Sequence, residues 1–239
     1  MIFNQNSKSL SIDNIKPIYT ASVPVLKIQC NMENDIPKEI KDNIYKSFKF
    51  DKSEVNLIKF DLTFFEIKHN QKITSIPSQS VIEFIKNILI CNPEIKPILL
   101  VLKRYMQICK LNSSFHGGIS SFSLFLLLYA FLKYINMNYP MGKILFDFFQ
   151  FYGNFNFGNY CIDVNDKNLY IKRKELLESR MIILDPFTKL NVAKSSFRVD
   201  EIKSAFKDAM NIINKHLYES FSNKNQFSVN ILEEIFKLK

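Results

Sequence analysis

The first third of the chain alternates hydrophobic and polar residues as β-strands do. Residues 15–30 mix Ile and Val with polar side chains, and Pro17 and Pro24 disfavour a helix there. Residues 55–67 alternate most clearly. One face of that predicted strand consists of Ile58, Phe60, Leu62 and Phe64. The pattern predicts a small sheet before residue 70, with a short helix over residues 39–48.

From residue 78 onward the hydrophobic spacing becomes helical. Ser80 and Glu83 predict a capping box at the start of one helix. Pro97 begins another helix, which is apolar until the adjacent cations Lys103 and Arg104 interrupt it. Further elements are a core helix over residues 124–132, helices over 142–152 and 199–221, and a hairpin over 160–172. We therefore expect an α+β fold in which a small sheet precedes a mostly helical body.

Composition places the chain among folded proteins and argues against a membrane span. Hydrophobic residues make up 47% of the 239 residues, and there are 23 Phe and 10 Tyr. The longest apolar run, residues 122–132, is well short of the roughly 18 residues that a membrane helix needs. No basic segment followed by an apolar one begins the chain, so we expect no secretory signal and no membrane partner.

Cysteine usage and net charge limit the kinds of site and partner that the sequence supports. The four Cys and three His are scattered without metal-ligand spacing, which favours neither a zinc site nor a disulfide framework and fits a reducing, intracellular compartment. The net charge of +9 favours a polyanionic partner such as RNA. However, Lys, Asn, Ile and Phe are abundant throughout, so a general coding bias could produce the same basic surface.

Two features of the sequence are candidates for a binding or catalytic site. Residues 115–123 place two of the five glycines, Gly117 and Gly118, in one turn before a hydroxyl-rich helix start. Free amides there could bind phosphate, with Lys103 beside it. The alternative for the turn is an ordinary loop with serine caps, which the pattern alone favours. The alternative for Lys103 is a side chain whose ammonium group extends into solvent at the protein surface. Asp61 lies mid-strand on a polar face, as either a solvated or a functional carboxylate.

Segments spread along the chain resemble one family in the same order. Residues 21–27 and 60–64 resemble the late palm strands of the Trf/Cid-type terminal nucleotidyltransferases, which belong to the DNA polymerase β-like superfamily. Residues 102–105, 111–112 and 115–123 resemble the central helical domain. Residues 142–153 resemble the start of the PAP-associated region, and residues 183–187 and 191–197 resemble the nucleotide recognition motif. The resemblance implies a partial palm over residues 1–70 and a helical central domain over 75–239, with the PAP-associated region at about 140–197.

The resemblance also implies an activity and a site. The family adds nucleotides, usually AMP from ATP, to RNA 3′ ends without a template, as a polynucleotide adenylyltransferase that uses Mg²⁺ or Mn²⁺. Asp61 matches the third metal-binding, catalytic carboxylate, and Phe122 falls where an aromatic side chain stacks on the incoming base. The implied nucleotide-binding residues are Ser78, Lys103, Gly117, Gly118, Ser120, Ser121, Phe122, Leu190, Asn191 and Lys194.

Departures from the family pattern change the expectation for this chain. It contains neither a Gly-Ser pair nor an Asp-x-Asp pair, which hold the triphosphate and both metals in the family. One carboxylate cannot hold two magnesium ions, so we expect the chain alone to be inactive, through a gene model started at an internal Met, a split gene or a real loss. A non-catalytic RNA-binding or scaffold relative is the alternative. Leu190 stands where the uridylyl-adding branch carries His, which favours adenylyl over uridylyl transfer.

The resemblance implies a setting as well. Its members act on RNA 3′ ends in RNA surveillance and processing, and often work beside a helicase and a zinc-knuckle RNA-binding protein. We therefore expect a nuclear or nucleolar protein rather than a cytoplasmic one.

Overall fold

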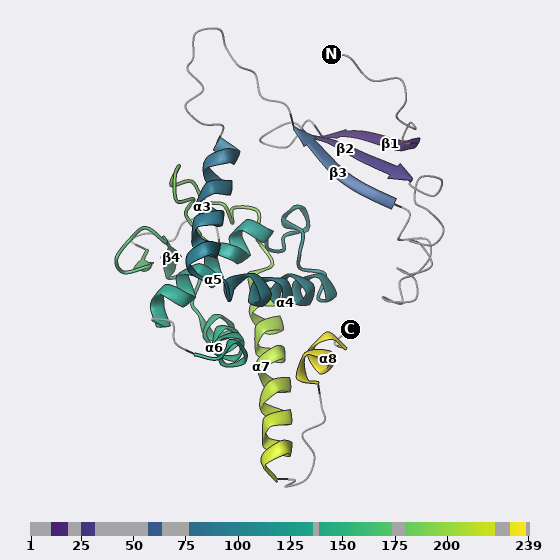
Figure 1. The fold of residues 1–239 in the computed structure, drawn as a ribbon. Coiled ribbons are helices and arrows are strands. Elements are labelled where there is room, and N and C mark those ends of the chain that lie inside the picture. The colour runs from purple at the N-terminus through teal and green to yellow at the C-terminus, as the bar shows by residue number, and fades with distance from the viewer. Residues whose placement is uncertain are drawn as a thin grey trace. The chain divides into compact units, whose positions relative to one another are not determined.

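The chain divides into two compact units, residues 1–76 and 77–239, next to the expected boundary at 70–75. A computed structural model describes residues 11–18, 25–31, 57–63, 77–135, 139–173, 180–222 and 230–237 (Figure 1). Each unit is considered by itself. The first holds strands and the second is mainly helical, which confirms the predicted α+β class.

The first unit contains a three-stranded antiparallel sheet in the order β1-β2-β3. The strands are β1 Ser11–Ile18, β2 Val25–Asn31 and β3 Leu57–Thr63. The extended region expected over residues 15–30 is thus two paired strands. Pro17 lies in β1, opposite Leu26, where an edge strand tolerates its missing N–H. Asp61 lies midway along β3 opposite Lys27, and the helix predicted over 39–48 falls outside the described residues.

The second unit is built mainly from helices and also contains one hairpin. The long amphipathic helix expected over residues 199–221 and the hairpin expected over 160–172 are both confirmed. The helices are α3 Pro77–Cys91, α4 Ile95–Ile108, α5 Ser121–Ile135, α6 Met141–Asn154, α7 Val199–Ser222 and α8 Ile231–Phe236. A 3-10 turn, Ser114–His116, precedes α5, and the hairpin pairs β4 Tyr160–Ile162 with β5 Tyr170–Lys172.

Two helix boundaries differ from the prediction. The helix α3 begins at Pro77, so Ser80 lies inside it and the predicted capping box is wrong. Proline suits a first helical turn because the N–H that it lacks has no partner there. The helix α4 starts two residues before Pro97 and continues through Lys103 and Arg104 to Ile108. The two cations are exposed and leave its buried face unbroken, so they do not interrupt the helix.

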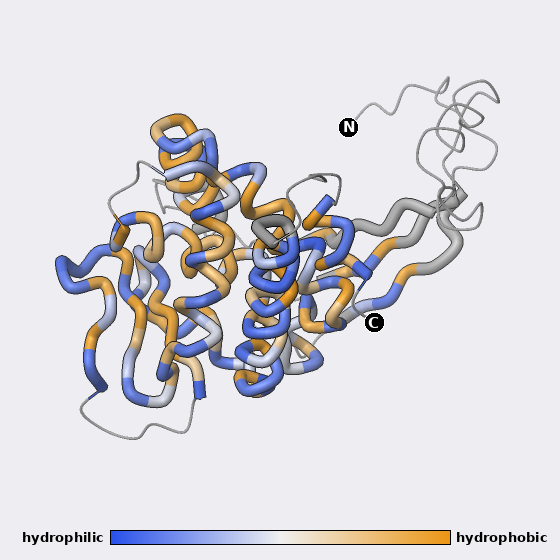
Figure 2. Tube along the Cα trace, turned by 90° about the horizontal axis from the view of Figure 1, so that it is seen from below, coloured by the Kyte–Doolittle hydropathy of each residue, from blue (hydrophilic) through white to orange (hydrophobic). Residues whose placement is uncertain are grey.

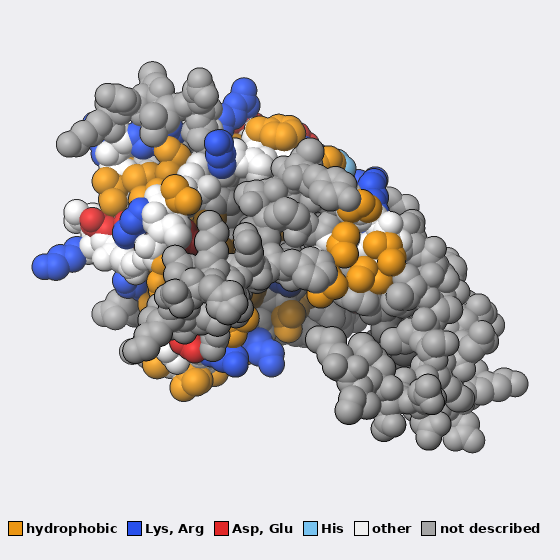
Figure 3. Space-filling view, turned by 90° about the horizontal axis from the view of Figure 1, so that it is seen from above, with side chains coloured by type: hydrophobic (Ala, Val, Ile, Leu, Met, Phe, Trp, Pro, Cys, Tyr) orange, Lys and Arg blue, Asp and Glu red, His pale blue; other side chains and the backbone are white. Residues whose placement is uncertain are grey.

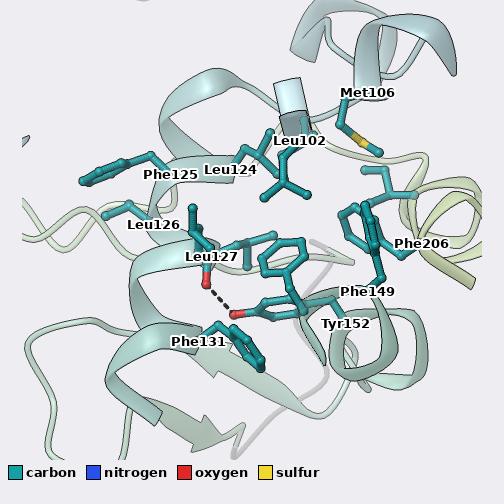
Figure 4. Close-up of a cluster of buried hydrophobic side chains, with 14 of the residues drawn as sticks. Leu102, Met106, Leu124, Phe125, Leu126, Leu127, Phe131, Phe149, Tyr152 and Phe206 are labelled. Atoms are coloured by element: carbon teal, nitrogen blue, oxygen red, sulfur yellow. Dashed lines mark hydrogen bonds between the residues drawn. The ribbon is translucent and has the colours of Figure 1, made fainter. Parts of the chain in front are cut away.

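The helix α5 forms the centre of the hydrophobic core, which confirms the core helix predicted over residues 124–132. Figure 4 shows its leucines and phenylalanines packed against side chains of α4, α6 and α7. The Tyr152 hydroxyl donates to the Leu127 carbonyl at 2.8 Å and lies 3.1 Å from the Tyr170 hydroxyl. Burial raises the pKa of Tyr152 well above its usual range, so this polar group stays neutral in the core.

Hydrophobic and polar residues follow separate stripes along the surrounding helices (Figure 2). Such stripes bury one side of each helix and expose the other. Among the described residues, no helix is both long and apolar enough to cross a membrane.

Candidate functional site

The glycine turn, residues 113–119, is closed by its own hydrogen bonds. The amide of Gly118 donates to the Ser113 carbonyl at 2.9 Å, and that of Gly117 donates to the Ser114 carbonyl at 3.1 Å. The amide of Ile119 donates to Leu111 at 2.7 Å. Both glycines are buried. The prediction that the amides of this turn are free to bind an anion is therefore wrong.

Close packing, rather than ligand contact, explains why two glycines occur here. Gly117 has φ of +80°, a conformation that L side chains rarely adopt, and a methyl group on it would overlap the Phe197 ring. A methyl group on Gly118 would overlap the carbonyl of Leu111. Each glycine thus lets another part of the chain approach the turn.

The first turn of α5 does present free donors. The Ser120 hydroxyl accepts the amide of Ser123 at 3.0 Å and so caps the helix, as the ordinary-loop alternative predicted. The amides of Ser121 and Phe122 donate to no group among the described residues, and the Ser121 side chain is exposed. Open amides at a helix N-terminus favour an anion. The amides that are open to an anion are thus those at the start of α5, and not those of the glycines before it.

The recognition loop, residues 183–197, is organised around Asn191. The side-chain oxygen of Asn191 accepts the amides of Ile183 at 3.1 Å and Ala193 at 2.9 Å. Its side-chain nitrogen donates to the Met181 carbonyl at 3.0 Å. Asn191 therefore shapes the loop. Leu190, by contrast, is 70% exposed.

Three hydrogen bonds fasten the recognition loop and the adjoining Arg198 to α5, the glycine turn and Lys110. The Ser123 hydroxyl donates to the Val192 carbonyl at 3.2 Å. The amide of Arg198 donates to the Gly117 carbonyl at 2.9 Å, and its guanidinium donates to the Lys110 carbonyl at 3.0 Å. Segments between 69 and 88 residues apart in sequence thus meet near the N-terminal end of α5.

A second group of contacts, which sequence reasoning missed, holds the tip of the recognition loop. The buried carboxylate of Asp163 pairs with the Lys189 ammonium at 2.6 Å. The Asn165 side chain donates to the Pro186 carbonyl at 2.7 Å. Lys189 has φ of +58°, and this strained residue directly precedes Leu190. No local sequence signal marks these partners because the fold of the hairpin brings them together.

The remaining predicted residues are distributed over both units. Lys103 is exposed on α4, Lys194 is exposed in the recognition loop, and Phe122 is half-buried against the core. Asp61 lies in β3 and Ser78 in the first turn of α3, and the side chains of both fall outside the described residues. The described residues contain no group of three His, Cys, Asp or Glu that could hold a metal ion.

Sequence comparison places residues 140–191 in a family described as Cid1 family poly A polymerase. Poly(A) RNA polymerase protein 1 of Eremothecium gossypii is 26% identical over 209 residues, which are 79% of this chain and 33% of that protein. The Saccharomyces cerevisiae protein of the same name is 27% identical over 168 residues, or 62% of this chain and 26% of that protein. The chain thus spans about a third or less of these relatives.

Structural comparison shows the same fold. The polymerase core of TRAMP, an RNA surveillance complex, matches 95% of this chain and 67% of its own length, with a TM-score of 0.66 and 20% identity. A crystal structure of mtPAP in complex with UTP matches 94% of this chain and 50% of its own, with a TM-score of 0.64 and 16% identity. The matched segment, the sequence similarity and the fold together show that the chain is similar to the Trf/Cid-type terminal nucleotidyltransferases, with the match to their PAP-associated region over residues 140–191.

Proposed function

We propose that this chain belongs to a template-independent RNA 3′-end adenylyltransferase, and that its second unit binds ATP with the triphosphate at the start of α5. The open amides of Ser121 and Phe122 carry this proposal, because they begin a 15-residue helix and have an exposed hydroxyl beside them. The recognition loop, which resembles the family's nucleotide recognition motif, is hydrogen-bonded to the same end of α5.

We propose that Lys103 and two residues of the recognition loop, Leu190 and Lys194, contact the nucleotide. An ammonium is a compact charge that suits a triphosphate, and Lys103 is exposed on α4, which packs against α5. Leu190 and Lys194 are exposed for contact with the base, whereas Asn191 acts by holding the loop. An apolar Leu190 in place of a histidine favours adenine over uracil.

Metal chemistry is not assigned to this chain. Magnesium or manganese would activate the 3′-hydroxyl and neutralise the pyrophosphate in such a reaction, but the described residues form no site for it. The 239 residues also contain no Asp-x-Asp pair. We therefore propose that this polypeptide binds nucleotide without extending RNA by itself.

Calorimetric titration with ATP and UTP tests the nucleotide site. Ser121→Ala and Lys103→Ala should each raise the Kd for ATP about tenfold, as expected for the loss of a hydrogen bond or ion pair to a charged group. Lys96→Ala, which removes an exposed lysine from the same helix, is the matched control and should leave the Kd unchanged. Absence of ATP binding, or equal effects of all three variants, contradicts the assignment. Tighter binding of UTP would favour the uridylyl alternative.

An RNA extension assay tests the second half of the proposal. With ATP or UTP and magnesium or manganese, the chain should leave the RNA length unchanged. Robust tailing that disappears in Asp61→Ala would show that the metal site is complete after all.

A non-catalytic RNA-binding relative is the second candidate. The missing Asp-x-Asp pair favours it, and one relative, from Drosophila melanogaster, is named Inactive non-canonical poly(A) RNA polymerase protein Trf4-2. That protein is 26% identical over 193 residues, 73% of this chain and 47% of its own length. RNA binding without ATP binding would support this candidate. In either role we propose RNA, a helicase and a zinc-knuckle protein as partners, in the nucleus.

A further inference from the structure

Two phenylalanine side chains beside the glycine turn are unusually exposed. Phe115, inside the turn, is 83% exposed, and Phe197, at the end of the recognition loop, is 59% exposed. The ring of Phe197 rests on Gly117, so both side chains belong to the same small surface. We call Phe115, His116 and Phe197 the aromatic surface. Figure 3 shows that hydrophobic side chains also gather among Lys and Arg on the face drawn there.

The backbone beneath the aromatic surface is held firmly. The hydrogen bonds that close the glycine turn fix the main chain at Phe115, and the Phe115 and His116 rings meet edge to face at 5.1 Å. Phe197 directly precedes Arg198, whose amide and guanidinium bind the carbonyls of Gly117 and Lys110. An exposed ring on a fixed backbone loses little freedom when a ligand stacks on it.

Two of the cations near the aromatic surface, Arg198 and Lys110, lie close to the carboxylates of Glu201 and Asp208. Arg198 is paired with Glu201 through two hydrogen bonds. Lys110 is exposed and lines a recess of about 360 Å³ together with Glu201 and Asp208. Such a surface offers little local attraction to a phosphate backbone. It offers flat apolar faces, which suit the unpaired bases of a single strand.

We propose that Phe115 and Phe197 stack on unpaired bases of single-stranded RNA. The net charge of +9 supplies long-range attraction to the strand, and the two rings supply the contact. The two rings are not among the residues proposed above to contact ATP. The inference rests on the proposed function in taking RNA as the ligand.

Because the sequence contains no Trp, fluorescence can test the stacking directly. Phe115→Trp introduces a single reporter, and Tyr218→Trp, at a 75% exposed position on α7, is the matched control. A nucleobase stacked on an indole quenches its emission. We expect an adenylate oligonucleotide to quench Phe115→Trp and not Tyr218→Trp, and inorganic polyphosphate to quench neither.

Affinity measurements by fluorescence anisotropy of labelled RNA complete the test. Phe115→Ala should raise the Kd for the oligonucleotide about tenfold, and this ratio should stay constant as salt is increased, because the lost contact is uncharged. Tyr218→Ala should leave the Kd unchanged.

Several results would overturn the inference. They are an unchanged Kd in Phe115→Ala, equal quenching of both reporters, quenching by polyphosphate, or self-association that Phe115→Ala abolishes. The last result would identify a protein interface instead. Titration with ATP remains a separate readout, so failure of the stacking site and failure of the proposed function give different results.

Discussion

The glycine turn and the first turn of α5 are neighbours in sequence, yet they differ in what they leave open. In the turn, the amides of Gly117, Gly118 and Ile119 are all donated to nearby carbonyls. Just beyond it, the amides of Ser121 and Phe122 have no acceptor among the described residues. One stretch closes on itself, and the next presents donors beside an exposed hydroxyl.

The difference shows that a glycine in the sequence and an open backbone amide in the structure are separate features. Glycine marks places where no Cβ fits, and both glycines here meet another part of the chain at that point. An anion site needs donors without partners, and a helix start supplies them as a matter of geometry. The comparison therefore predicts that substitutions in the turn strongly destabilise the protein without removing a ligand contact. Substitution of Ser121 at the start of α5 should remove a ligand contact with little effect on stability.

Gly118→Ala should have the largest effect. The new methyl group would overlap the Leu111 carbonyl, which cannot move aside because it accepts the amide of Ile119. We expect a loss of about 4 kcal/mol or more in the free energy of unfolding, measured by urea titration of the helical circular dichroism signal.

Gly142→Ala is the control for that substitution, since nothing lies within 4 Å of the corresponding position in α6. It should be neutral or stabilise the protein by up to about 1 kcal/mol. If Gly118→Ala were equally neutral, the close packing of the turn would be disproved.

Gly117→Ala should destabilise the protein by about 2 kcal/mol. Part of this loss comes from placing a side chain at φ of +80°, and part from displacing the Phe197 ring. The double variant Gly117→Ala/Phe197→Ala separates the two contributions, because it removes the overlap and keeps the backbone strain. Unfolding free energies of the single and double variants should reveal a coupling of about 1 kcal/mol. Strict additivity would mean that the ring does not depend on the glycine.

Sequence patterns predict the elements of this protein better than their ends. The helix over residues 199–221 and the apolar run of α5 are long and periodic, so packing and local preference agree. The predicted start of α3 is wrong because Ser80 and Glu83 have the spacing of a capping box but lie inside the helix. The helix begins instead at Pro77, a residue that suits a first helical turn.

The sequence proposes the residues of the candidate site, but it does not show what each of them contacts in the folded chain. Ser121, Lys103 and Leu190 are exposed, as ligand-facing groups must be, whereas Asn191 and the two glycines hold the backbone. Such roles depend on which acceptor each donor finds in the folded chain. The pair of Asp163 and Lys189 could not be predicted at all, because two polar residues 26 positions apart carry no shared local signal.

The smallest effect distinguishes the two serines that begin α5. Ser120→Ala removes the hydroxyl that accepts the Ser123 amide and should cost about 1 kcal/mol in unfolding free energy. Ser121→Ala removes an exposed hydroxyl with no described partner and should change that free energy by less than about 0.5 kcal/mol. Urea titration of both variants in the absence of nucleotide checks this order. Were Ser121→Ala the more destabilising change, its hydroxyl would be a structural cap, and the start of α5 would be closed in the same way as the glycine turn.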